Sequence, residues 1–381
     1  MIPSLRLEVS IDDQTLKVID GGQCIREFAI STATKGMGFK MDSYRTPTGR
    51  FVISEKIGGG ETSGTIFKQR VPAGRWNAGD QSEGDLVLTR ILRLDGLDPE
   101  NANTRDRCIY IHGTNHEELL GQPASHGCIR MGNADIIGLF DILDEGTPLV
   151  IHPATVRRGK LFFIDCDSTL SSIEGIDELA RARGGDVFQR VVDLTNAAMN
   201  GEVPIHEVFP RRMEMIRPDR ELCESVARLY METVVPGVPE MIRQIKAAGW
   251  TPVILSGGFA PLIMPLAAML GIDHIEAVPI HFHEDDSYRD YDRGYPTTRN
   301  LGKNEIIREW KDAMLPLRVV MTGDGISDLE TKPDVDLFIG FGGVVARPPV
   351  RDGCDCWLTD MHETAVISNV LEGEPIGPRD A

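Results

Sequence analysis

The chain has 381 residues, of which 41% are apolar and 26% charged, and its formal charge is −18. This length indicates two domains, and this composition excludes a disordered or collagen-like chain. Forty Lys and Arg residues against 58 Asp and Glu residues argue against nucleic-acid binding, which needs a basic surface. The sequence starts without a basic segment followed by an apolar one, and no run of about 18 apolar residues occurs. We therefore expect a cytoplasmic protein that does not insert into membranes.

The first 152 residues contain short apolar runs separated by Gly, Thr and Asp, a pattern typical of strands and turns. Such runs are LRLEVSI (5–11), GRFVISE (49–55) and PLVIHP (148–153). One helix is predicted near residues 133–143, where apolar side chains recur at helical spacing. We expect a mostly-β domain over residues 1–154.

From residue 160 onward, buried-strand patterns alternate with amphipathic helical stretches. The strand patterns are LFFID (161–165), TPVILSGG (251–258), RVVMTGDG (318–325) and VDLFIGFGG (335–343). Strands that alternate with helices favour a parallel sheet, so we expect an α/β domain over residues 155–381. The segment between 281 and 292 is irregular; its two His residues suggest a metal site less than a β-hairpin, because no third ligand accompanies them.

Polar side chains follow several of these predicted strands. Asp165 and Asp167 come directly after the first, Ser256, Gly257 and Gly258 end the second, and Asp324 and Asp328 follow the third. Lys303 lies at a predicted helix start. Because open α/β sheets bind ligands beyond the carboxyl ends of their strands, we expect these groups to converge there.

With these motifs, residues 160–368 resemble the phosphoserine phosphatases of the haloacid dehalogenase superfamily. EGIDELA (174–180), SGGF (256–259) and GDGISDLE (323–330) carry the resemblance. It implies a Rossmann-like fold with a helical cap over about residues 172–245. It also implies L-phosphoserine as the substrate and Mg²⁺ as the cofactor, although another small phosphomonoester stays open as an alternative.

The resemblance also implies a role for each residue. Asp165 is the nucleophile, and Asp167 is the general acid and base. The groups that hold the phosphoryl oxygens are Ser256, Gly257, Gly258 and Lys303. The implied magnesium ligands are Asp165, the backbone carbonyl of Asp167 and Asp324, with Asp328 as a supporting carboxylate. Glu174 binds the substrate ammonium and Arg212 its carboxylate, while Met199 and Ile205 line the apolar side of the pocket.

The N-terminal half contains a cysteine near two histidines, in HGT (112–114) and SHGCIR (125–130). A Cys beside an imidazole is typical of a thiol nucleophile, because the imidazole lowers the pKa of the thiol. We expect the amides at Gly127 and Cys128 to form an oxyanion hole.

Residues 5–152 resemble the L,D-transpeptidase catalytic domain, on the strength of RTPTGRF (45–51), YIHGT (110–114), SHGCIRM (125–131) and GTPLVIHP (146–153). The resemblance implies that Cys128 attacks a peptide carbonyl in a peptidoglycan stem peptide and that His126 is its base. His112 and the backbone near Gly127 would hold the tetrahedral intermediate, and Arg130 would orient the loop or a substrate carboxylate.

Three interpretations of this half stay open. The domain transfers acyl groups in the cell wall, or it hydrolyses muropeptides as an L,D-carboxypeptidase in the cytoplasm, or it only binds muropeptides and regulates the phosphatase. We favour the second, because phosphoserine is a cytoplasmic metabolite and the two halves share one chain.

Overall fold

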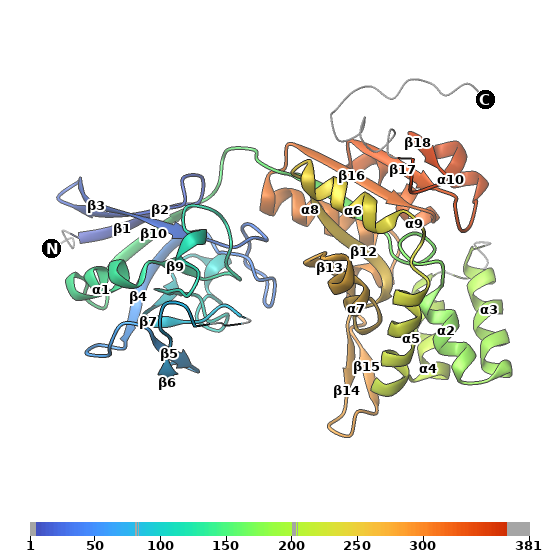
Figure 1. Cartoon of the computed structure of the whole chain (residues 1–381), viewed down its shortest axis with the longest axis horizontal. Helices are drawn as coiled ribbons and strands as arrows, with labels where there is room; N and C mark the ends of the chain where they lie inside the picture. Colours follow the sequence, from blue (N-terminus) through green and yellow to red (C-terminus); the bar gives the residue numbers. More distant parts are fainter. Residues whose placement is uncertain (1–4, 81, 83, 200–202, 204, 364–381) are drawn as a thin grey trace. The chain divides into compact units, whose positions relative to one another are not determined.

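Figure 1 shows the computed structural model, which describes residues 5–80, 82, 84–199, 203 and 205–363, without the side chains of 196–199 and 205. The chain forms two compact units, one of Met1–Arg157 with the short segment Trp310–Leu315, the other of Arg158–Glu309 and Pro316–Ala381. Among the described residues, no helix combines the length and apolar character needed to cross a membrane.

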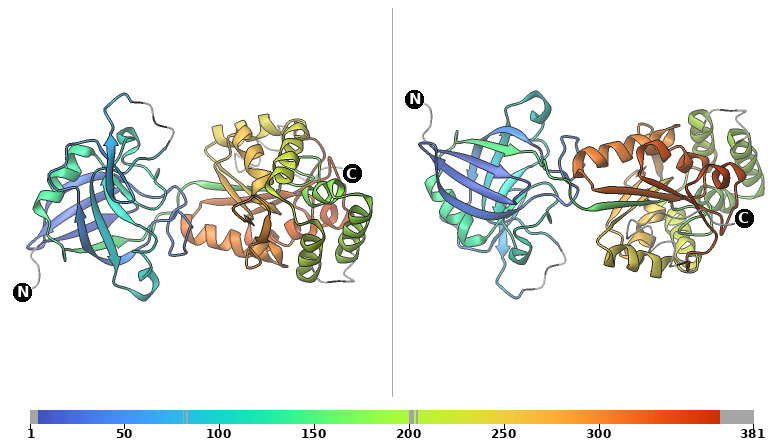
Figure 2. Two further views of the ribbon diagram at one scale, coloured as in Figure 1. Left: turned by 90° about the horizontal axis from the view of Figure 1, so that it is seen from below. Right: turned by 90° about the horizontal axis from the view of Figure 1, so that it is seen from above.

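The first unit is built on one ten-stranded sheet, seen from two further sides in Figure 2. The strand order is β4-β10-β1-β2-β3-β9-β8-β7-β5-β6, and β4 also pairs with β7, which closes eight strands into a barrel. The strands are β1 (Leu5–Ser10), β2 (Thr15–Asp20), β3 (Gln23–Ser31), β4 (Gly49–Ile57), β5 (Thr65–Lys68), β6 (Val71–Arg75), β7 (Leu88–Gly96), β8 (Tyr110–Gly113), β9 (Ile129–Met131) and β10 (Pro148–His152).

Strand alternation builds the core of this barrel. Leu7 and Val9 on β1 face Val18 and Leu16 on the antiparallel β2, and all four are fully buried. The helix α1 (Asn133–Ile142) adds Ile136, Leu139 and Phe140 to the same core. The expectation of a mostly-β domain with one helix near residues 133–143 is confirmed.

The second unit contains a six-stranded sheet in the order β13-β12-β11-β16-β17-β18, in which every pairing is parallel. Its strands are β11 (Lys160–Ile164), β12 (Thr251–Phe259), β13 (His274–Val278), β16 (Arg318–Gly323), β17 (Leu337–Phe341) and β18 (Cys356–Leu358). The hairpin of β14 (Ile280–Phe282) and β15 (Tyr288–Tyr291) matches the hairpin expected between 281 and 292.

The first four helices after β11 are grouped together on one side of this sheet in Figure 1: α2 (Gly175–Ala182), α3 (Gly185–Met199), α4 (Ile205–Ile216) and α5 (Arg220–Glu232). The other helices are α6 (Val238–Ala247), α7 (Ala260–Leu270), α8 (Gly302–Met314), α9 (Ile326–Leu329) and α10 (Pro348–Gly353). Single 3₁₀ turns occur at Pro99–Asn101, Glu117–Leu119, Pro296–Thr298 and Lys332–Asp334.

Candidate active sites

Three carboxylates and a lysine meet at the carboxyl edge of the C-terminal sheet. Asp165 follows β11, Asp324 follows β16, and Asp328 lies in α9; their carboxylate oxygens lie within 4.8 Å of one another. Lys303, near the start of α8, donates to Asp165 Oδ1 at 2.7 Å and to Asp328 Oδ1 at 2.5 Å. All four side chains are buried. The structure thus brings together groups that lie up to 163 residues apart in the sequence.

The electrostatics of this cluster indicate a place for a cation. Burial, and then the neighbouring Asp328, raise the pKa of Asp165 well above its usual range. Burial and Asp328 also raise the pKa of Asp324 to about 7. Ionised together, these carboxylates repel one another at low dielectric, and Lys303 with the nearby Arg347 does not balance all three of them. An all-oxygen set of acids suits Mg²⁺, so the residues present fit the implied metal.

Asp167 lies beside the phosphate-binding segment that the sequence predicts. A β-carbon placed on Gly258 would lie 2.9 Å from Asp167 Oδ2 and 3.1 Å from the Ser256 hydroxyl oxygen. Both oxygens therefore lie close to the Gly258 backbone at the end of β12. The other oxygen of Asp167, Oδ1, accepts hydrogen bonds from the Tyr230 hydroxyl and from the Gly175 amide. Burial raises the pKa of Asp167 to about 6.

Glu174 and Arg212 lie on the helical side of this cluster. Glu174 directly precedes α2 and accepts a hydrogen bond from Ser168 Oγ at 2.7 Å, and burial raises its pKa to about 7. Arg212 on α4 is buried and donates to Thr195 Oγ1 at 3.2 Å. Its Nε has no hydrogen-bond partner among the described residues, which leaves a buried donor for an anionic group. The side chains of Met199 and Ile205 lie outside the described residues.

Arg347, which lies between β17 and α10, is a site residue that the sequence does not predict. Its Nε lies 3.2 Å from Asp324 Oδ2, and its guanidinium lies 4.0 Å from Glu174 Oε1. It therefore links the carboxylate cluster to the acid at the start of α2. An Arg before two prolines in a loop has no spacing that distinguishes it from surface arginines, so only the fold reveals its position.

In the N-terminal unit, Cys128 lies immediately before β9 and is partly buried. Burial raises the pKa of its thiol to about 12, against a smaller opposing effect of a backbone hydrogen bond from Tyr110. The expectation of a lowered thiol pKa is therefore wrong, because desolvation of the thiolate outweighs the nearby donors. At neutral pH this thiol needs a base to remove its proton.

His112 shares a sheet face with Cys128. The strands β8 and β9 are parallel, with Ile111 opposite Ile129 and His112 opposite Arg130, and alternate residues point to one side. His112 is buried, which lowers its pKa, so the ring is neutral. Its Nδ1 lies 2.8 Å from the Gly113 carbonyl oxygen, which can only accept; the proton therefore sits on Nδ1, and Nε2 is left as a proton acceptor.

His126 has different surroundings. Its side chain is 67% exposed, its ring meets Tyr44 edge-on at 6.1 Å, and its Nδ1 lies 4.0 Å from Asp85 Oδ2. Asp85, which the sequence analysis missed, also binds Arg130 at 2.6 Å, and the Arg130 side chain is only 2% exposed. The Arg130 side chain is thus buried and held by Asp85 rather than directed at solvent. The Gly127 amide donates to Ser125 Oγ at 3.2 Å, so an oxyanion hole at this amide would compete with that bond.

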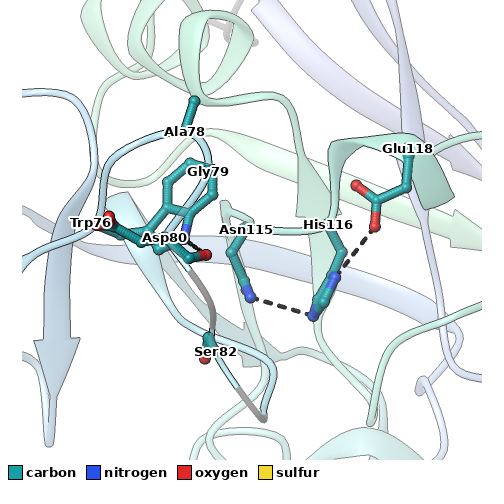
Figure 3. A pocket seen from close by; sticks show the side chains of 8 residues that line it. All are labelled: Trp76, Ala78, Gly79, Asp80, Ser82, Asn115, His116 and Glu118. Carbon is teal, nitrogen blue, oxygen red and sulfur yellow. Dashed lines mark hydrogen bonds and ion pairs between the residues drawn. The ribbon is translucent and has the colours of Figure 1, made fainter.

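A surface hollow of about 480 Å³ lies between residues 76–80 and 115–118 of the N-terminal unit (Figure 3). Trp76 and Asp80 line it, and Asn115 binds His116, whose other ring nitrogen lies 3.2 Å from Glu118. The Leu86 amide donates to Asn115 Oδ1 at 2.8 Å, which ties the hollow to the residue after Asp85. None of the sequence-predicted site residues lines this hollow.

Comparison with known protein families finds a matching family for each half of the chain. The L,D-transpeptidase catalytic domain family matches residues 4–151, and the haloacid dehalogenase-like hydrolase family matches residues 162–331. Phosphoserine phosphatase from Bos taurus is 33% identical over 201 residues, which are 52% of this chain and 88% of that protein. The chain belongs to the phosphoserine phosphatase family. Its C-terminal half is the phosphatase domain, and its N-terminal half is an L,D-transpeptidase-type domain.

Further relatives agree with this assignment. Phosphoserine phosphatase from Homo sapiens is 32% identical over 212 residues, covering 54% of this chain and 93% of that protein. The enzyme from Drosophila melanogaster is 33% identical over 214 residues, covering 55% of this chain and 77% of that protein. These relatives match about half of the chain. The transpeptidase-type domain is present in addition to the half that they match.

Proposed function

We propose that the phosphatase domain hydrolyses L-phosphoserine to L-serine and phosphate through an aspartyl-phosphate, and that it depends on Mg²⁺. The observation that carries this proposal is the convergence of Asp165, Asp167, Ser256 and Lys303 at one sheet edge, with the buried Arg212 on a neighbouring helix. We further propose that residues 155–381 form a Rossmann-like domain in which the segment 172–245, containing α2 to α5, is the cap.

The chemistry proceeds in two displacements. Asp165 attacks phosphorus while the bond to the serine oxygen breaks, and Asp167 gives its proton to that oxygen. Asp167 then takes a proton from water, which attacks the aspartyl-phosphate and releases phosphate and free Asp165. Ser256, the amides of Gly257 and Gly258, and Lys303 hold the phosphoryl oxygens in both steps.

Mg²⁺, held by Asp165, Asp324 and the Asp167 carbonyl and supported by Asp328, would supply positive charge that offsets the repulsion between carboxylates and phosphate. Glu174 would bind the substrate ammonium, and the Arg212 guanidinium, through its N–H groups, would bind its carboxylate. Arg347 would hold Glu174 and Asp324 at a fixed separation.

Release of phosphate from L-phosphoserine by the full chain with Mg²⁺ tests this function. We expect turnover by the wild type and none by Asp165→Asn, which keeps the shape of the side chain but not its nucleophilicity. No turnover of L-phosphoserine alongside rapid hydrolysis of another small phosphomonoester would favour that other ester as the substrate.

A second activity is proposed for residues 1–154: acyl transfer or hydrolysis at peptidoglycan stem peptides or muropeptides, with Cys128 as nucleophile. The neutral His112, with Nε2 as acceptor on the sheet face of Cys128, supports His112 as the base in place of His126. We expect a thiol-reactive carbapenem to acylate Cys128, seen as an increase in intact mass that Cys128→Ser loses. Absence of an adduct would favour a muropeptide-binding module.

A further inference from the structure

The two carboxylate oxygens of Asp167 have different surroundings. Oδ1 accepts hydrogen bonds from the Tyr230 hydroxyl and, at 3.2 Å, from the Gly175 amide. Oδ2 faces the Gly258 backbone, where it lies 2.9 Å from the position of a β-carbon on that glycine. One oxygen is therefore held by the protein, and the other points toward the phosphate-binding segment.

Tyr230 reaches Asp167 from a different element. It lies on α5, and its side chain is fully buried in the core of the phosphatase domain. A β-carbon on Gly175 would lie 2.1 Å from the Tyr230 hydroxyl oxygen, so only a glycine at the start of α2 allows this approach. The hydroxyl is thus fixed by packing, with Asp167 as its acceptor.

This arrangement decides which oxygen of Asp167 carries a proton. A carboxylate oxygen has two lone pairs, and both donors on Oδ1 occupy that oxygen. A proton on the Asp167 carboxyl group must therefore sit on Oδ2, the atom that faces the phosphate site. A general acid acts only when its proton lies within hydrogen-bond reach of the leaving atom.

We propose that Tyr230 is a positioning residue for the phosphatase reaction: its hydroxyl fixes the Asp167 carboxyl group so that Oδ2 delivers the proton to the departing alkoxide. The proposal rests on the phosphatase activity proposed above. Tyr230 itself does not touch the substrate or exchange a proton in either step.

The dependence of the rate on the leaving group tests this role. An alkoxide leaves L-phosphoserine only with a proton, whereas p-nitrophenolate is a stable anion that leaves without one. Tyr230→Phe keeps the ring and removes the hydroxyl. We expect it to lower kcat/KM for L-phosphoserine about tenfold more than it lowers kcat/KM for p-nitrophenyl phosphate. This difference is smaller than the whole effect of general-acid catalysis, because Asp167 itself is still present. Tyr288→Phe, at another buried tyrosine of the same domain, is the matched control and should leave kcat/KM unchanged for both esters.

A double-mutant cycle supplies the second measurement. If Tyr230 acts through Asp167, then Tyr230→Phe should have no further effect on L-phosphoserine hydrolysis in an Asp167→Asn background. Equal losses with both esters, additive effects in the cycle, or no change with either ester would each overturn the proposal. Failure of the wild type to hydrolyse either ester would instead overturn the proposed phosphatase function.

Discussion

The two proposed nucleophiles of the chain, Asp165 and Cys128, require different groups around them. Asp165 is already surrounded by acids, and its activity requires positive charge that keeps it ionised despite burial. Cys128 is a partly buried thiol whose pKa of about 12 keeps it protonated, so its activity requires a base. We propose that the neutral His112 ring, with its proton held on Nδ1 by the Gly113 carbonyl, supplies that base.

This difference predicts unequal effects of the two histidines near Cys128. We expect His112→Ala to slow acylation of Cys128 by a carbapenem by about 10²-fold or more, the range that general-base catalysis contributes. His126→Ala, which removes an exposed ring, should have a much smaller effect. Time-resolved intact mass measures both rates, with peptide mapping to separate Cys128 from the exposed Cys24 and Cys108. A larger loss in His126→Ala would restore His126 as the base.

At the scale of elements, the sequence predicts what lies at strand ends. Asp165 and Asp324 were expected to meet because they follow apolar runs typical of parallel strands, and β11 and β16 are neighbours in the sheet. The contributions of Tyr230 and Arg347 were not predictable. Tyr230 and Arg347 lie in a helix and a loop without distinctive spacing, and the three-residue β9 is too short for a periodic pattern.

The orientation of helix α4 carries a prediction about specificity. Arg212 is buried, and its Nε has no partner in the part of the chain that the structure describes, whereas its neighbour Arg211 is 58% exposed and pairs with Glu207. We expect Arg212→Ala to lower kcat/KM for L-phosphoserine roughly 10- to 100-fold, since hydrogen bonds to charged groups contribute about 1.5–3 kcal/mol. The loss should be much smaller for O-phosphoethanolamine, which lacks the carboxylate. Arg211→Ala is the control, and a loss there as large as in Arg212→Ala would contradict the assignment.

At the scale of the whole molecule, the negative charge is concentrated in the phosphatase half, where residues 159–381 carry −15 of the total −18. Part of that charge is buried: the pKa values of Asp167, Asp324 and Glu174 are raised to about 6, 7 and 7. Raised pKa values mean that the folded state binds protons more tightly than the unfolded state does. Their contribution to stability is therefore full below pH 4 and is lost as the pH rises to about 7.

Magnesium should reverse this loss, because it stabilises the ionised carboxylates. We expect Mg²⁺ to raise the thermal midpoint of the phosphatase domain more at pH 8 than at pH 5, with a stabilisation of roughly 2.7 kcal/mol when free Mg²⁺ is a hundred times its dissociation constant. Samples with Mg²⁺ and with a chelator are compared at the same pH, so the effect of carboxylates elsewhere in the chain on the thermal midpoint cancels. Asp324→Asn should reduce the shift; an equal shift at both pH values would contradict the assigned site.

Acid quenching during turnover tests the phosphatase chemistry most directly. Full-length protein mixed with Mg²⁺ and excess L-phosphoserine, then quenched in acid and digested, should yield the peptide that contains Asp165 with one added phosphoryl group. The adduct should be absent from Asp165→Asn and should accumulate in a variant that fails only in the second displacement. Steady turnover of L-phosphoserine with the phosphoryl group on another residue, or on none, would contradict an aspartyl-phosphate at Asp165.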